Sequence, residues 1–337
     1  TKLFNWHRTG KPVAVYIPMY GERGVLKSER LIVGANKDNS PKGYRGGTEN
    51  DAIQDIRYDA KGQRQYLKLG NETITHYDYD PETFRLKQLR TTRPTYDPSF
   101  PDYHADLQDP KVLQQLHYTY DPVGNITEIH DEAYKTAYFQ NAIIEPKNRY
   151  EYDAIYRLIE ATGREDGAIS GAPDDFEAKI RETSFPITDA NALRRYIQTY
   201  QYDSVGNIKQ MHHSAGMGTW TRTNAYATDS NRLIKTTHRN QNTDIRYDSH
   251  GSMLNLANVA DAFLMQWDHR DMIASINLGG GSFAYYQYDA NKQRTRKYIE
   301  KNNGNIVEER IYLGGMELYR RIENGDLKEE IETLHLF

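Results

Sequence analysis

Pairs of an aromatic residue and an aspartate recur along this chain and define its pattern of apolar and polar positions. The pairs are Tyr58-Asp59, Tyr79-Asp80, Tyr120-Asp121, Tyr152-Asp153, Tyr202-Asp203, Tyr247-Asp248, Trp267-Asp268 and Tyr288-Asp289. The residue two positions before each aromatic is usually apolar or aromatic too, as with Ile56 and Tyr200. A period of two places both side chains on one face of a strand. The pattern therefore predicts a β-strand that arrives at each pair.

The aspartate of each pair opens a turn, and the turns come in two versions. In the first version Gly stands three residues after Asp, as in Asp121-Pro122-Val123-Gly124, Asp203-Ser204-Val205-Gly206 and Asp59-Ala60-Lys61-Gly62. This is the signature of a type I turn, in which Asp accepts backbone hydrogen bonds and Gly supplies a positive φ. The second version ends in Arg-Leu, as in Phe84-Arg85-Leu86, Tyr156-Arg157-Leu158 and Asn231-Arg232-Leu233, and the two versions alternate along the chain.

The spacing of the motifs predicts that each repeat is a β-hairpin. From Tyr202 onward successive aromatic positions are 20 to 24 residues apart, with Tyr226 filling one position and its Asp displaced to Asp229. Twenty extended residues would span about 66 Å, too long for one strand. Each unit must fold back once, and residues 258–261 and 279–281 have the composition of such turns. We expect an all-β fold, a strip of hairpins with strands in well over half of the ordered residues.

The repeats predict one continuous segment over residues 1–337. Residues 1–50 contain degenerate repeats, including a copy at Trp6–Gly10 and strands at 13–17 and 30–33; residues 51–320 contain the clear repeats, and 321–337 the end of the strip. Insertions interrupt the pattern near 91–112 and 163–196. The first is rich in proline and is expected to be a surface excursion. In the second, Asp174-Asp175 and Asp189 are expected to cap short helices that end at Ile180 and Tyr196.

Composition and charge narrow the class of protein. The 337 residues are 37% apolar, but 27 of them are Tyr, and the mean hydropathy of −0.86 indicates a largely wet surface. Forty-three basic and 47 acidic residues are interspersed, which disfavours nucleic acid as a partner. No apolar run approaches the roughly 18 residues of a transmembrane segment. The absence of Cys excludes disulfides and thiolate metal sites. Because the sequence starts at Thr1 and stops within a repeat-like pattern, we expect a piece of a longer protein.

Metal binding by the repeats is the first chemical possibility, and the sequence argues against it. One hypothesis is that the turn aspartates form a column of carboxylates for Ca²⁺. Ca²⁺ needs six to eight oxygen ligands, but each turn offers one carboxylate already suited to its own backbone. His212 and His213 are adjacent, so they point to opposite faces of a strand and do not suit one metal ion. No metal site is predicted.

Catalysis is the second chemical possibility, and no candidate is persuasive. Glu165-Asp166 and Asp174-Asp175 are carboxylate pairs that we expect to be solvated charges. The glycines 279–281 lack the Lys-Ser/Thr of a phosphate loop, and Ser170 is misplaced for a nucleophile elbow. The sequence therefore predicts no catalytic residue, no cofactor and no enzyme.

The alternation of the two turn versions resembles the RHS/YD repeats of bacterial polymorphic toxins, Tc insecticidal toxin complexes and animal teneurins. Three stretches are most similar to the B–C portion of Tc complexes: residues 150–165, 200–207 and 310–319. The resemblance extends from about Trp6 to Phe337. It implies a strip that curls into part of a hollow shell, or cocoon, in a secreted, extracellular bacterial toxin.

The resemblance also implies a function and partners. The shell would enclose and protect a toxic C-terminal polypeptide, adjoin further RHS repeats or a partner toxin subunit, and release its content through a translocation channel component. The self-cleaving RHS core that normally follows such repeats is absent here, because the only DPxG motif, Asp121 to Gly124, is an ordinary repeat turn.

The abundance of Tyr leaves a second class of function open. Exposed Tyr could serve a cell-surface adhesion or glycan-binding module. The alternative that we favour is a ladder, in which the ring of each hairpin packs on the next across about 4.8 Å.

Overall fold

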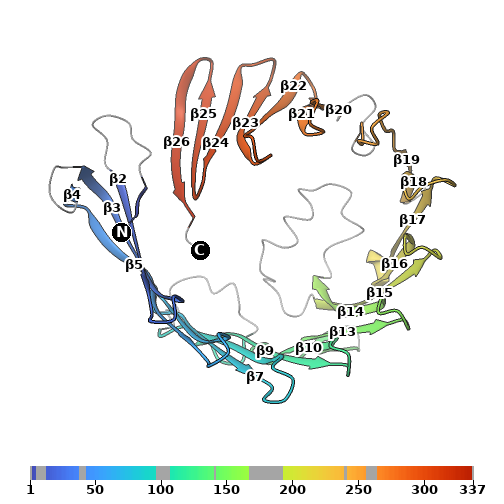
Figure 1. Cartoon of the computed structure of the whole chain (residues 1–337). Helices are drawn as coiled ribbons and strands as arrows, with labels where there is room; N and C mark the ends of the chain where they lie inside the picture. The colour runs from blue at the N-terminus through green and yellow to red at the C-terminus, as the bar shows by residue number, and fades with distance from the viewer. Residues whose placement is uncertain are drawn as a thin grey trace. The chain divides into compact units, whose positions relative to one another are not determined.

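A computed structural model describes residues 2–4, 13–37, 43–95, 107–139, 142–166, 193–238, 241–255 and 264–335. The chain divides into two compact units, Thr1–Thr221 and Arg222–Phe337. Each unit consists of antiparallel strands that follow one another in chain order, as the colours of Figure 1 show.

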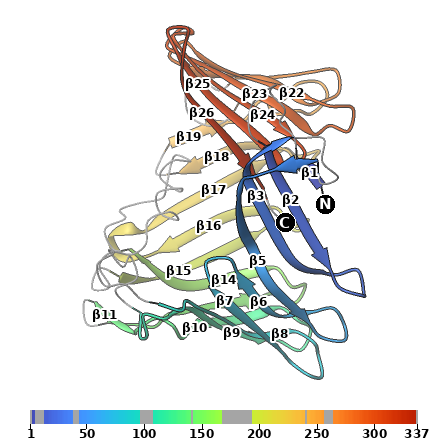
Figure 2. The same cartoon turned by 90° about the vertical axis from the view of Figure 1, so that its left-hand side faces the viewer.

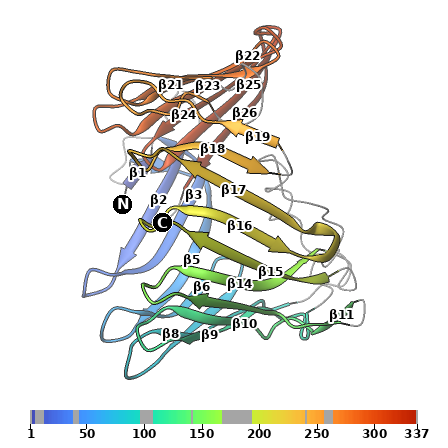
Figure 3. The ribbon, with the colours of Figure 1, turned by 90° about the vertical axis from the view of Figure 1, so that its right-hand side faces the viewer.

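The first unit is a meander in which each long strand pairs with the next one along the chain. Figure 2 shows β2, β3 and β5 side by side, and Figure 3 shows β14, β15 and β16. Its strands are β1 (Lys2–Phe4), β2 (Val13–Tyr20), β3 (Leu26–Lys37), β5 (Thr48–Tyr58), β6 (Arg64–Leu69), β7 (Ile74–Tyr79), β8 (Leu86–Thr92), β9 (Val112–Tyr120), β10 (Ile126–Asp131), β13 (Lys147–Tyr152), β14 (Leu158–Asp166), β15 (Leu193–Tyr202) and β16 (Ile208–Ser214). The short β4 (Tyr44–Arg45) pairs with β3, and β11 (Ala137–Phe139) with β12 (Ala142–Ile144).

The second unit repeats the hairpin pattern. β17 (Trp220–Tyr226), which crosses the unit boundary along the chain, pairs with β18 (Leu233–His238), and β18 pairs with β19 (Gln241–Asp244). A seven-stranded sheet follows, again with each strand beside the next. Its strands are β20 (Met265–Trp267), β21 (Ile273–Gly279), β22 (Ser282–Tyr288), β23 (Arg294–Lys301), β24 (Ile306–Leu313), β25 (Met316–Glu323) and β26 (Asp326–Leu334).

The all-β prediction is confirmed, because strands make up most of the described residues and the described ranges contain no α-helix, only a 3-10 turn at Gly216–Gly218. The hairpin turn at 279–281 and the early strands around 13–17 and 30–33 are confirmed as well. The copy at Trp6–Gly10, the turn at 258–261, the cap at Asp174-Asp175 and most of both insertions lie outside the described residues.

One boundary of the predicted helices is wrong. The helix expected to end at Tyr196 is, from Leu193 onward, the start of β15. These residues pair with the end of β14, where Asp166 lies opposite Leu193 and Gly163 opposite Tyr196. Leu193 is fully buried there, so the sheet register and apolar burial outweigh the local helix signal.

The core is distributed along the sheet in small local clusters. One joins Val15, Ile32 and Ala35, and another joins Met265, Ile276 and Ala284. Each cluster draws on strands of the same or neighbouring hairpins. Stability therefore comes mainly from contacts between successive repeats, as in other repeat proteins.

Candidate functional site

The repeat turns have the geometry that their sequence predicts. In the turn that begins at Asp203, the Oδ1 atom accepts hydrogen bonds from the backbone N–H groups of Val205 at 3.0 Å and Asn207 at 2.8 Å. The Asn207 side chain donates to Oδ2 at 2.9 Å, and Gly206 has a φ of +99°. In the turn at Asp121, Oδ1 accepts hydrogen bonds from the backbone N–H groups of Gly124 and Asn125, and the Asn125 side chain donates to Oδ2. The carboxylate is thus used within its own turn.

The pKa shifts of the turn aspartates agree with hydrogen bonding of each carboxylate within its own turn. Burial alone would raise the pKa of Asp203, but the hydrogen bonds from Asn207, Val205 and Gly206 outweigh it and leave the pKa below the ordinary value. At Asp153, the backbone N–H of Arg157 and its guanidinium, 2.6 Å away, lower the pKa of the carboxyl. Within the described ranges no group of three or more His, Cys, Asp or Glu could hold a metal ion.

The second version of the turn places a non-glycine residue in the left-handed region. Phe84 has a φ of +59° and Tyr156 a φ of +66°, in the turns that begin at Asp80 and Asp153. Such backbone conformations are unfavourable for bulky side chains. Hydrogen bonds within each turn, such as Phe84 N–H to Asp80 O and Tyr156 N–H to Asp153 O at 2.9 Å, hold them in place.

Arginine side chains connect two of the Arg-Leu turns to the turn that follows. Arg85 donates to the carbonyl oxygen of Asp121 at 3.0 Å, and Arg157 donates to that of Asp203 at 3.3 Å. A β-carbon on Gly124 would lie 2.9 Å from Arg85 Nη2, so the glycine leaves room for the guanidinium. The alternation of the two turn versions in the sequence marks these arginines, but the contact itself was not predicted from the sequence.

Arginines at two further turns make the same contact. Arg23 donates to the carbonyl of Asp59 at 3.0 Å, and Arg270 donates to that of Asp289 at 2.8 Å. We call these contacts the arginine links. They join residues that are 19 to 46 positions apart in sequence and so tie consecutive repeats together at their ends.

The motif tyrosines form a second set of connections, which we call the tyrosine links. Seven of the motif aromatics donate a side-chain hydrogen bond to a backbone carbonyl oxygen just after the preceding turn, in most cases that of the first residue of the next strand. The bonds are Tyr79 to Arg64 at 2.9 Å, Tyr120 to Leu86 at 2.7 Å, Tyr152 to Ile126 at 2.8 Å, Tyr202 to Leu158 at 2.7 Å, Tyr247 to Leu233 at 2.9 Å, Trp267 to Met253 at 2.7 Å and Tyr288 to Ile273 at 3.0 Å.

The predicted ladder of stacked motif rings is wrong for the described residues. Ring pairs there join, for example, Tyr118 with Tyr120 along one strand and Tyr285 with Tyr298 across two strands, but not one motif aromatic with the next. Successive motif aromatics stand on every second strand, about 10 Å apart, which is too far for direct stacking. Instead, Arg157 lies 4.6 Å from the ring centroid of Tyr202, and Arg85 lies 5.6 Å from that of Tyr120.

One carboxylate candidate, Glu165, and one histidine candidate, His213, meet in a buried cluster. Glu165 accepts a hydrogen bond from Arg194 at 2.7 Å, and its other oxygen lies 3.0 Å from His213 Nε2. The His213 ring is stacked between Tyr196 and Trp220, with ring centroids 5.0 and 5.2 Å away. The expectation that Glu165 is a solvated charge is therefore wrong, since its side chain is only 20% exposed.

The two histidines take different partners, as expected for opposite faces. His212 Nδ1 lies 2.8 Å from the Thr221 hydroxyl, whereas His213 meets Glu165. Burial alone would raise the pKa of Glu165, but the hydrogen bonds and positive charges of His213 and Arg194 outweigh it and hold the pKa below its usual range. The cluster joins β14, β15 and β16 and contains no nucleophile, so its geometry suits a structural role.

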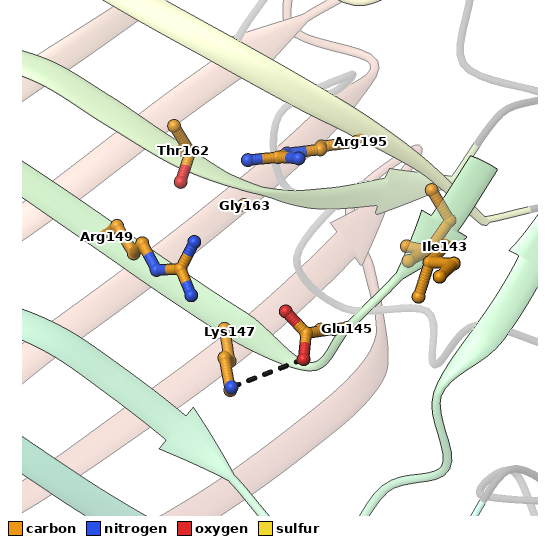
Figure 4. A pocket seen from close by; sticks show the side chains of 8 residues that line it. Ile143, Glu145, Lys147, Arg149, Thr162, Gly163 and Arg195 are labelled. Atoms are coloured by element: carbon orange, nitrogen blue, oxygen red, sulfur yellow. Dashed lines mark hydrogen bonds and ion pairs between the residues drawn. The ribbon is translucent and has the colours of Figure 1, made fainter.

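A small cavity of about 30 Å³ lies where β12 meets β13, β14 and β15 (Figure 4). It has room for about one water molecule. Lys147 in its wall is 3.2 Å from Glu145, and Arg149 is 2.8 Å from Glu128, so these two cations are compensated, while the third, Arg195, is exposed. This cavity does not offer a substrate site.

Two further features of the described residues bear on function. The glycines 279–281 form a turn between two strands and do not open a helix, as expected. No helix in the described part of the chain has the length and apolar character needed to cross a membrane.

The fold and its contacts define a class: antiparallel sheets built from hairpin repeats in each of two units, with arginine and tyrosine links at the turns. No family model matches the sequence. Toxin subunit YenC1 of Yersinia entomophaga is 32% identical over 322 residues, which cover 91% of this chain and 30% of the relative. Toxin subunit YenC2 of the same organism is 31% identical over 297 residues, or 85% of this chain and 29% of the relative.

Solved structures show the same fold. A TcdB2–TccC3 complex without its hypervariable C-terminal region matches with a TM-score of 0.74 and 26% identity, over 97% of this chain and 14% of that chain. The Photorhabdus luminescens Tc holotoxin pore matches with a TM-score of 0.73 and 26% identity, over 96% of this chain and 14% of that chain. The chain is thus an RHS/YD-repeat segment homologous to Tc toxin subunits, and it spans about 30% of the length of the curated relatives it matches.

Proposed function

We propose that this chain is a wall segment of a secreted Tc-type toxin, which encloses and protects a toxic polypeptide before delivery. The observation that supports the proposal most directly is the set of links between successive turns. Because each repeat is stabilised mainly by its neighbours, a wall one sheet thick can be extended without a central core. The homology to toxin subunits supports the same function.

In this proposal the segment has a structural role and not a catalytic one. The turn carboxylates are occupied by backbone N–H groups, and Glu165 is occupied by Arg194 and His213. Both units would be stretches of one continuous strip. Adjoining repeats or a partner subunit would complete the enclosure, and a channel component would receive the enclosed polypeptide.

Electron microscopy of the intact parent protein, with and without its C-terminal region, tests the proposal. We expect a closed envelope whose internal density disappears on truncation, and a C-terminal region that resists protease as long as the envelope is intact. An open sheet, or a C-terminal region that is digested as fast as the free polypeptide, would contradict encapsulation.

A variant without an arginine link provides a matched test. Arg157→Ala removes the bond to Asp203 and the contact with the Tyr202 ring, so the enclosed region should become more sensitive to protease. Arg195→Ala, which alters an exposed arginine in the neighbouring strand, is the control and should leave protection unchanged.

A further inference from the structure

An aromatic groove lies on the face of the β22–β23 hairpin that is opposite its local core. Ala284 and Tyr286 on β22 pack into the cluster around Ile276. Because side chains alternate along a strand, Phe283 and Tyr285 point to the other face, where they are 36% and 40% exposed. Large aromatic side chains are therefore presented on a face that is otherwise polar.

The strand register gathers these aromatic residues with polar ones. Tyr285 lies opposite Tyr298, with ring centroids 6.4 Å apart and planes inclined by 47°. Phe283 lies beside Tyr285, with centroids 6.2 Å apart. The open groove has a volume of about 370 Å³ and is lined by Tyr285, Gln287, Arg296, Tyr298 and Glu300.

The polar groups of the groove differ in how they are used. Arg296 is bound to Glu309 at 2.6 Å and lies 4.9 Å from the ring centroid of Tyr298, so its charge is compensated and its position is set. Among the described residues no intramolecular partner is found for the side chains of Gln287 or Glu300, or for the hydroxyls of Tyr285 and Tyr298. These amide, carboxylate and hydroxyl groups are free to bind a ligand at the edge of the aromatic rings.

The charges in the groove select the class of ligand. The Arg296 guanidinium already occupies the cation position over the Tyr298 ring, so a further cation would not gain this contact. An anion would be repelled by the unpaired carboxylate of Glu300. A neutral ligand with an apolar face and several hydroxyls would satisfy both the rings and the polar groups, and a pyranose has these properties.

We propose that this groove binds a neutral hexopyranose oligosaccharide, with a sugar ring against Tyr285 and Tyr298 and its hydroxyls bonded to Gln287 and Glu300. This site does not depend on the encapsulation function. An extended peptide is the less suitable ligand, because both backbone edges of β22 and β23 are already paired, with β21, with each other and with β24.

Saturation-transfer NMR on the full 337-residue chain tests the proposal, with maltohexaose, cellohexaose and chitohexaose as separate probes. We expect binding of at least one of them, with an affinity reduced tenfold or more by Tyr285→Ala and by Tyr298→Ala. Tyr285→Phe keeps the ring and should stay within about threefold of the parent. Tyr138→Ala is the control, because Tyr138 is 71% exposed and lies far along the chain in β11.

Several outcomes would overturn the proposal. They are no saturation transfer to any of the three sugars, equal binding by Tyr285→Ala and the parent when both have the same circular dichroism spectrum, or preference for 3′-sialyllactose over the neutral sugars. Competition of the sugar signal by a reduced, carboxymethylated polypeptide at equal concentration would identify an unfolded chain as the ligand instead. Loss of enclosure in the parent protein would leave this result unchanged, so the two proposals fail independently.

Discussion

The tyrosine link between Tyr202 and Leu158 offers the most direct test of how the repeats hold together. The Tyr202 hydroxyl donates to the Leu158 carbonyl at 2.7 Å and joins residues 44 positions apart, on either side of the second insertion. Tyr202→Phe removes this hydroxyl and keeps the ring. A net loss of about 1 kcal/mol in the free energy of unfolding is expected for one part-buried hydrogen bond.

Tyr202→Ala is expected to reduce the free energy of unfolding further, and the structure shows which contacts contribute to this loss. Besides the hydroxyl, it removes the contact with the Arg157 guanidinium, 4.6 Å from the ring centroid, for about 0.5–1 kcal/mol. Losing a partly buried ring adds roughly 1–2 kcal/mol. The total is about 3 kcal/mol, so the two variants should differ by about 2 kcal/mol.

Urea unfolding followed by fluorescence measures the loss, and hydrogen exchange of the peptides in β14 and β15 locates it. Tyr138→Phe is the matched control, because this exposed ring should change stability by less than about 0.5 kcal/mol. If Tyr202→Phe and Tyr138→Phe unfold alike, and exchange in β14 is unchanged, the hydroxyl does not join the repeats and the reasoning is refuted.

Three further predictions concern one turn and two ionisable groups. Gly206→Val should lower the unfolding free energy by about 1–3 kcal/mol, because a β-branched residue is forced to a φ of +99°; an unchanged thermal midpoint would disprove this. The folded-state pKa of Glu165 is depressed, so its stabilisation is present above the ordinary value of 4.5 and is lost as pH falls through the folded value. The gap in stability between the parent and Glu165→Gln should therefore shrink on acidification, and a gap that does not vary with pH would contradict it. The Asp271 carboxylate, 3.0 Å away, raises the pKa of His250, so its contribution is complete below pH 6.5 and is lost as pH rises through the folded value; NMR titration should show a midpoint above 6.5 that falls in Asp271→Asn.

Local chemistry explains why the sequence alone predicts the hairpins and their turns. Asp203 and Asn207 are four residues apart, and every bond that shapes this turn lies within that interval. The same applies to the strands, whose period of two is visible before any partner is known. The family resemblance also follows from these local motifs, since alternating turns occur throughout the chain.

The tertiary structure decided which distant residues meet. Arg157 donates to a carbonyl 46 residues away, and Glu165 contacts Arg194 across the second insertion. Neither contact can be predicted from local residue spacing. The stacked ladder failed for a related reason, because the return strand of each hairpin separates successive motif rings. The groove at Tyr285 and Tyr298 likewise exists only through the register of β22 and β23. A shift of one residue in that register would send Tyr298 to the opposite face, because side chains alternate along a strand.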